Sequence, residues 1–171
     1  MPINTDPHIH NLVLCANIFV RKDGKYLVMK RSPSKKYLPN AVHPIGGKLD
    51  PHEDPYIGAQ RELLEEAGII VKNMRLEAVI LEIKPDKNRD ENWLIFHFSG
   101  DYESGEIKET EEGELILLTP EEIQQQELFP SVKASIKHIL NPEAGTVFLT
   151  VMYDGNEQMI EQSNTINFCA K

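Results

Sequence analysis

Three glutamates in the middle of the chain stand at a spacing that could do chemistry. Glu62, Glu65 and Glu66 occupy positions i, i+3 and i+4, so on a helix their carboxylates project from one strip. One interpretation is a solvated acidic face, because each like-charge pair costs an isolated helix only about 0.2 to 0.5 kcal/mol. The other interpretation is a cation site. The spacing alone leaves both open.

The residues around the strip favour the cation site. Gly46 and Gly47 precede it in a loop where the backbone can approach a ligand closely. Carboxylates and a loop carbonyl are hard oxygen ligands that suit Mg²⁺ or Mn²⁺. The chain has only two cysteines, and its six histidines are scattered. The absence of a His/Cys cluster argues against zinc.

The helix that positions the strip has start and stop signals. Asp54 is a favoured N-cap, and Pro55 suits the first helical position. Gly68 is the residue type expected just past the C-terminal end. The apolar residues between these signals recur at spacings of three and four: Tyr56, Ala59, Leu63 and Ala67. This pattern predicts a helix of three to four turns with one buried face.

Strands are predicted on both sides of this helix. Leu12 to Val20 and Lys25 to Lys30 are β-rich runs around the hairpin signal Asp23-Gly24, and the segment from Arg31 to Asp54 reads as irregular. Further strands are expected over 75–83, 93–98 and 114–118, helices over 120–126 and 131–140, and a closing hairpin over 147–160. We therefore expect one α+β domain over residues 12–162, a mixed sheet with the acidic helix packed on it. Residues 1–11 would be an N-terminal arm and residues 163–171 a C-terminal tail.

Charge and composition limit the partners. The 171 residues include 27 Asp and Glu against 18 Lys and Arg, a net charge of -9, which disfavours long nucleic acid and anionic membranes. No apolar run approaches the roughly 18 residues of a membrane span, and no signal-peptide pattern opens the chain. The sparse cysteines fit a reducing compartment. We expect a cytoplasmic protein that acts on a small molecule, as a monomer or a homodimer.

The stretch from Gly47 to Ile69 resembles the signature of the Nudix hydrolase family. Gly47 is followed at the family's spacing by Glu53, Arg61-Glu62-Leu63, Glu65-Glu66 and Gly68-Ile69. The order of strands and helices from Leu12 to Leu140 is also similar to the Nudix α/β/α sandwich. The resemblance implies hydrolysis of a nucleoside diphosphate linked to another moiety, with Mg²⁺ as cofactor and Mn²⁺ able to substitute.

The resemblance also implies roles for individual residues. The metal ligands it implies are three helix glutamates and a loop carbonyl: Glu62, Glu65, Glu66 and Gly47. Glu53 and Arg61 would form a buried pair that fixes the loop against the helix. Glu65 is the first candidate for the group that activates water. Glu112 is a second catalytic candidate, because Glu112-Gly113 matches a pair in relatives resembling MutT; a solvated charge run is the other interpretation there.

Four residues that are not fixed positions of the signature are candidate substrate contacts. Arg31 and Lys48 are placed to contact phosphate, although each is equally well explained as an exposed cation. Trp93 and Phe129 are candidates for stacking on the base. Stacking on these aromatic rings would strengthen nucleotide binding without distinguishing one base from another.

The nature of the nucleotide stays open. The whole-chain pattern resembles the MutT branch, yet His43 and the pair Ser131-Val132 stand where relatives carry purine-reading Asn and Asp side chains. We therefore expect a nucleoside triphosphate or diphosphate derivative with modest discrimination between normal and oxidised purines. Pro85 lies at a spacing associated with ADP-ribose pyrophosphatases, which makes that activity the alternative. A nucleotide sensor without turnover is the alternative from another class, disfavoured because the signature is complete.

Overall fold

The fold is known from a computed structural model that describes residues 11–86, 88–108, 112–141, 145–153 and 159–164. The strands are β1 (Leu12–Lys22), β2 (Lys25–Arg31), β3 (Val42–His43), β4 (Ile45–Lys48), β5 (Ile69–Glu82), β6 (Asn92–Gly105), β7 (Gly113–Leu118), β8 (Val147–Tyr153) and β9 (Met159–Asn164). The helices are α1 (Pro55–Ala67), α2 (Pro120–Gln124) and α3 (Pro130–Ile139). The described strands form one mixed sheet in the order β3-β2-β1-β6-β5-β8-β9, with β4 paired to β1 and β7 paired to β2.

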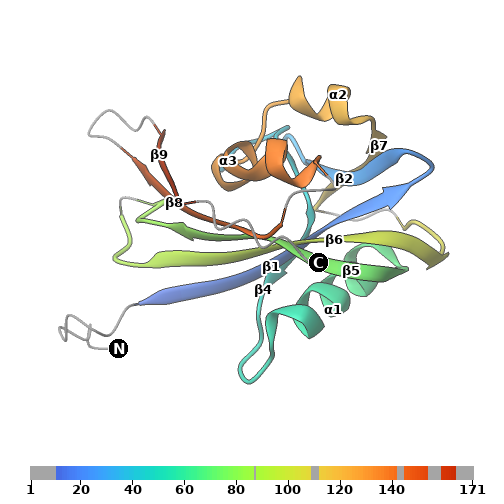
Figure 1. The fold of residues 1–171 in the computed structure, drawn as a ribbon, viewed down its shortest axis with the longest axis horizontal. Helices are drawn as coiled ribbons and strands as arrows, with labels where there is room; N and C mark the ends of the chain where they lie inside the picture. The colour runs from blue at the N-terminus through green and yellow to red at the C-terminus, as the bar shows by residue number, and fades with distance from the viewer. Residues whose placement is uncertain (1–10, 87, 109–111, 142–144, 154–158, 165–171) are drawn as a thin grey trace.

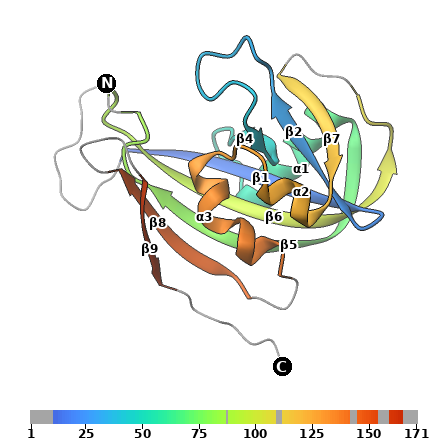
Figure 2. The same cartoon turned by 90° about the horizontal axis from the view of Figure 1, so that it is seen from above.

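Helices cover both faces of the sheet. Figure 1 shows α1 on one side and α2 and α3 on the other, and Figure 2 shows α3 lying across β6 and β5. Leu63 of α1 packs in one core cluster with Ile18 of β1. Phe19, the next residue of β1, packs in a second cluster with Ile136 of α3, because successive strand residues point to opposite faces. The expected α/β/α sandwich is confirmed.

Local signals define α1. The Asp54 carboxylate accepts hydrogen bonds from the backbone N–H groups of Tyr56 and Ile57 at 2.9 and 3.1 Å. Gly68 ends the helix in the left-handed conformation with φ 70°. Three of the four predicted apolar residues are buried, Ala59, Leu63 and Ala67. Tyr56 is 45% exposed, and its ring meets that of Phe98 in a T-shaped arrangement.

The expectation that residues 31–54 are irregular is wrong. β3 and β4 lie within that segment, and β4 pairs antiparallel with β1. The two glycines hide the alternation of apolar residues, and the pairing partner is distant in the sequence. Gly46 is needed there: its φ is 145°, and a Cβ on it would lie 2.2 Å from the backbone oxygen of Ala16. At Gly46 the backbone of β4 therefore lies too close to the backbone of β1 to leave room for a Cβ.

Other boundaries also differ from the sequence prediction. β5 and β6 extend well beyond the expected strands 75–83 and 93–98, because their extra residues pair with each other through a ladder with several register shifts. The β1–β2 hairpin is confirmed, and so is the closing β8–β9 pairing. Most of the expected arm and tail, and residues 109–111 of the acidic stretch, lie outside the described residues. In the part of the chain that the structure describes, no helix is both long and apolar enough to span a membrane.

Gly46→Ala tests the close approach of β4 to β1. We expect the substitution to lower the free energy of unfolding by about 3 kcal/mol or more, because backbone must move to admit the methyl group. Gly24→Ala is the matched control, since Gly24 also has a positive φ but nothing within 4 Å of its added Cβ, and about 1 kcal/mol is expected there. Urea denaturation measures both. Equal losses would contradict the tight approach.

Candidate active site

The acidic strip of α1 lies against β4. The side chain of Glu62 is only 14% exposed, and a Cβ on Gly47 would lie 2.9 Å from its carboxylate carbon. Glu65 is 60% exposed, and Glu66 has one buried carboxylate oxygen. The missing side chain of Gly47 thus leaves the space that the Glu62 carboxylate fills, and backbone and acid are in contact at this point.

Glu53 and Arg61 are joined in a two-pronged ion pair. Arg61 donates from Nε to Glu53 Oε1 at 2.8 Å and from Nη2 to Glu53 Oε2 at 2.9 Å. Glu53 Oε2 also accepts from the backbone N–H of Asp50, and Arg61 Nη2 donates to the backbone oxygen of Lys48. These bonds tie the loop before α1 to the helix. The guanidinium, with help from the Asp50 N–H, lowers the pKa of Glu53 to about 2.

Arg61 also contacts the acidic strip. Its Nη1 donates to Glu62 Oε1 at 2.9 Å and to Glu65 Oε2 at 3.1 Å. One guanidinium therefore bonds to three carboxylates, counting that of Glu53. Burial raises the pKa of Glu62, and the Arg61 hydrogen bond opposes that shift. The Glu53 carboxylate in turn raises the pKa of Arg61, so the cation at the centre stays charged.

Glu66 forms no ion pair with any of the residues that the structure describes. Burial, and next the charge of Glu62, raise the pKa of Glu66 to about 7, although a backbone hydrogen bond from Gly46 acts in the opposite direction. Its buried Oε2 lacks a hydrogen-bond partner among the described residues. A buried carboxylate oxygen without a partner is costly unless a cation or a donor occupies the space beside it.

The oxygen atoms at this site are of the type that binds a hard divalent cation, although they do not yet surround a position for one. Glu62, Glu66 and the carbonyl of Gly47 are all oxygen donors, the type preferred by Mg²⁺ and Mn²⁺. Among the described residues no group of three acidic, His or Cys side chains already encloses a metal-sized position. Glu62 and Glu65 bond to Arg61 instead. Cation binding therefore requires these two carboxylates to exchange contacts.

The four candidate substrate residues form two cation–aromatic pairs. Lys48 Nζ lies 5.4 Å from the centre of the Trp93 ring. The Arg31 guanidinium lies 5.6 Å from the centre of the Phe129 ring, and its Nε donates to the backbone oxygen of Tyr37 at 2.9 Å. The Tyr37 ring meets Phe129 edge-on at 5.8 Å. The sequence does not indicate that Tyr37 lies beside Arg31 and Phe129, because its turn-rich segment has no periodic pattern.

Two buried polar groups beside these pairs lack partners among the described residues. His43 Nδ1 lies 2.7 Å from the backbone oxygen of Pro44; a carbonyl only accepts, so Nδ1 carries the proton and Nε2 is an acceptor. Burial lowers the pKa of His43 to about 4, which keeps the ring neutral near pH 7. His43 Nε2 and the Trp93 Nε1–H donor are both buried and unpaired.

The remaining candidates lie in different surroundings. Glu112 is half-exposed and pairs with Lys35 at 2.6 Å, and that bond lowers its pKa. Its charge still contributes to the raised pKa of Glu66. On α3, Val132 packs in the core, and Ser131 is buried with its backbone oxygen accepting from the Ser135 hydroxyl.

Comparisons with known proteins show the family and the fold to which this chain is similar. The family model described as NUDIX domain matches residues 11–139. The mutator MutT protein from Bacillus halodurans is 21% identical with a TM-score of 0.76, over 89% of this chain and 97% of that chain. A MutT NUDIX hydrolase from Burkholderia pseudomallei is 21% identical with a TM-score of 0.66, over 76% and 99% of the two chains.

An ADP-ribose pyrophosphatase from Streptococcus suis has the same fold at 15% identity and a TM-score of 0.58, over 80% of this chain and 98% of that chain. A search of curated proteins found no match. The structural likenesses show the fold, and the family model covers most of the chain, including the whole acidic strip. The chain therefore belongs to the NUDIX domain family of hydrolases.

Proposed function

We propose that the protein hydrolyses a diphosphate bond in a nucleoside triphosphate or a nucleoside diphosphate derivative, with Mg²⁺ as cofactor and Mn²⁺ able to replace it. Nudix hydrolases generally use divalent cations and act on small nucleotide substrates. The observation that carries the proposal is the buried, unpaired carboxylate oxygen of Glu66 beside Glu62 and the double glycine. An electropositive ligand satisfies that oxygen, whereas a solvated acidic face would not bury it.

The cation would be held by Glu62, Glu65, Glu66 and the Gly47 carbonyl. The chemistry supplied by such a cation is neutralisation of diphosphate charge and a lower pKa for the attacking water. Glu65 is exposed enough to turn from Arg61 toward a water, which makes it the first candidate for orienting the nucleophile. Glu112, held by Lys35 within electrostatic range of Glu66, is the second candidate for taking the proton.

The substrate would extend from the acidic strip toward the two cation–aromatic pairs. Lys48 and Arg31 are available to phosphate, and Trp93 and Phe129 to the base. His43 Nε2 and Trp93 Nε1–H offer one acceptor and one donor. Each of these atoms would meet a single group of a base, and one donor or one acceptor favours binding without strong discrimination.

Substitution of the strip glutamates tests the metal assignment. Glu65→Gln and Glu66→Gln are each expected to lower kcat by about 100-fold or more, because ligand charge is lost while side-chain size is kept. Thermal unfolding should change little. Glu121→Gln on α2, an exposed glutamate away from the strip, is the control. Turnover near the wild-type value in either strip variant, with Mg²⁺ or Mn²⁺ present, would refute the ligand role.

Glu53→Ala tests the positioning role of the ion pair. Because Arg61 would lose its two-pronged partner and the loop its anchor, we expect a lower Tm and a largely retained kcat at temperatures well below it. Asp50→Ala is the matched control, since Asp50 lies 3.8 Å from Arg61 Nε and is 71% exposed, and its Tm should stay close to wild type. An unchanged Tm with an abolished kcat in Glu53→Ala would place Glu53 in the chemistry instead.

A substrate panel tests the specificity. We expect kcat/KM for dGTP and 8-oxo-dGTP to agree within about tenfold, because neither His43 nor the buried Ser131 reproduces a carboxylate that reads two donors. The panel also includes dATP and ADP-ribose, with products identified by chromatography. A ratio of several hundred in favour of 8-oxo-dGTP would contradict the proposed pocket. Tight binding of these nucleotides without turnover would identify a sensor.

A further inference from the structure

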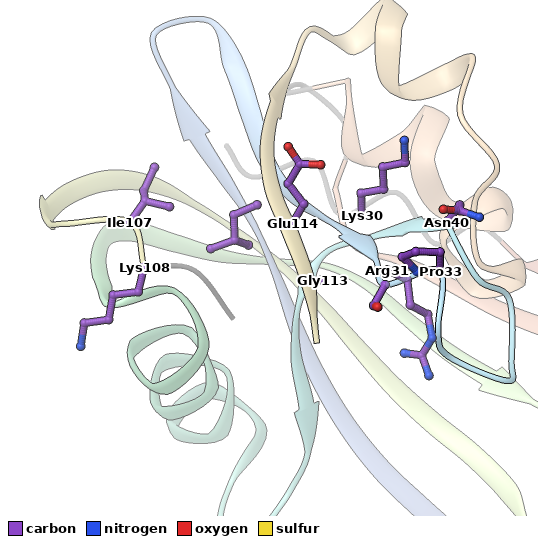
Figure 3. A pocket seen from close by; sticks show the side chains of 10 residues that line it. Lys30, Arg31, Pro33, Asn40, Ile107, Lys108, Gly113 and Glu114 are labelled. Carbon is purple, nitrogen blue, oxygen red and sulfur yellow. The ribbon is translucent and has the colours of Figure 1, made fainter. Parts of the chain in front are cut away.

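A hollow of about 660 Å³ lies beside the acidic strip, between the end of β2, the start of β7 and residues 107–108 (Figure 3). Its charged lining residues are Lys30, Arg31, Lys108 and Glu114. Lys30 and Glu114 are cross-strand neighbours in the β2–β7 ladder, and their side chains lie on the same side of it in Figure 3. Their charges offset each other. Arg31 and Lys108, at opposite ends of the hollow, are the excess cations in a chain of net charge -9.

The hollow adjoins the candidate active site at two points. Gly113 lines it and directly follows Glu112, whose charge reaches Glu66. The backbone N–H of Lys108 donates to the oxygen of Ala67 at the end of α1. The side chain of Lys108 runs past Gly68, where a Cβ would lie 2.9 Å from its Cδ and Cε. Lys108, which lines the hollow, is therefore in contact with the end of the helix that carries the acidic strip.

The cations of the hollow are available to a ligand. Among the described residues none forms an ion pair with the ammonium group of Lys108. Arg31 is held through Nε by the backbone oxygen of Tyr37, and its charge also acts on the Glu112 carboxylate. The volume falls within the roughly 300 to 1,000 Å³ typical of small-molecule sites. Two separated positive charges suit an extended anion better than an uncharged sugar.

We propose that this hollow binds the leaving group and selects leaving groups that carry negative charge beyond the phosphate at the cleaved bond, with Lys108 as a specificity-determining residue. The inference rests on the proposed function, because it assigns the far side of the same diphosphate bond. Arg31 contacts the phosphate nearest the acidic strip, and Lys108 contacts charge further out. Substrates whose leaving group is a phosphate chain or a second nucleotide are then preferred over those whose leaving group is a hexose phosphate, in which only the phosphate at the cleaved bond is charged.

Lys108→Gln tests this assignment, with Lys108→Arg as the conservative rescue and Lys25→Gln, in the distant β1–β2 hairpin, as the control. The substrates are a nucleoside triphosphate, a dinucleoside tetraphosphate and a nucleoside diphosphate hexose. We expect Lys108→Gln to raise KM about three- to tenfold for the first two, less at high salt, and to leave the hexose substrate unchanged. Equal losses on all three would show a structural role at the end of α1 and overturn the proposal.

Calorimetric titration of inorganic tripolyphosphate separates this inference from the proposed function. Wild-type protein and Lys25→Gln should bind tripolyphosphate alike, and Lys108→Gln should bind it about three- to tenfold more weakly. This measurement needs no turnover, so it still tests the hollow if no nucleotide in the panel is hydrolysed. Identical affinities for all three proteins would overturn the role of Lys108 even if hydrolysis is observed.

Discussion

The Arg61 guanidinium is the interaction on which the candidate site depends. It bonds to the carboxylates of Glu53, Glu62 and Glu65 and to the backbone oxygen of Lys48. Three carboxylates this close would repel one another, and the half-buried surroundings strengthen that repulsion. One delocalised cation with several donors in a fixed plane satisfies them together, as the single charge of a lysine would not. The loop, β4 and the acidic strip of α1 are thereby held in one arrangement.

The double glycine supplies the second constraint. Gly46 lets β4 lie against the backbone of β1, and Gly47 leaves room for the Glu62 carboxylate. Because both contacts are made by backbone, β4 lies close enough to α1 for a peptide carbonyl to join the carboxylates. That proximity has an energetic cost, visible in the raised pKa of Glu66. The Glu66 oxygen that lacks a hydrogen-bond partner among the described residues adds to that cost.

Much of α1 was predictable because its determinants are local. The Asp54 cap, the Gly68 end and the three-four spacing act within a few residues, and the strip spacing followed from helix geometry. β3 and β4 were not predictable, because their pairing partners are distant in the sequence. In β4, the two glycines also interrupt the alternation of apolar and polar residues that marks a strand. The extent of β5 and β6 depended on cross-strand pairing for the same reason. The tautomer of His43 and the contacts of Tyr37 depend on the folded structure, so no local sequence pattern indicates them.

We propose that the acidic strip and the Gly47 carbonyl hold a divalent cation. The most direct measurement is anomalous scattering from Mn²⁺ in crystals grown with a non-hydrolysable nucleotide analogue. We expect a Mn²⁺ peak bonded to Glu66 Oε2, with Glu62 and the Gly47 carbonyl in the same coordination shell. Glu62 would then bind Mn²⁺ in place of Arg61. A Mn²⁺ peak elsewhere, with Glu66 Oε2 still unpaired and Glu62 still bonded to Arg61, would contradict it.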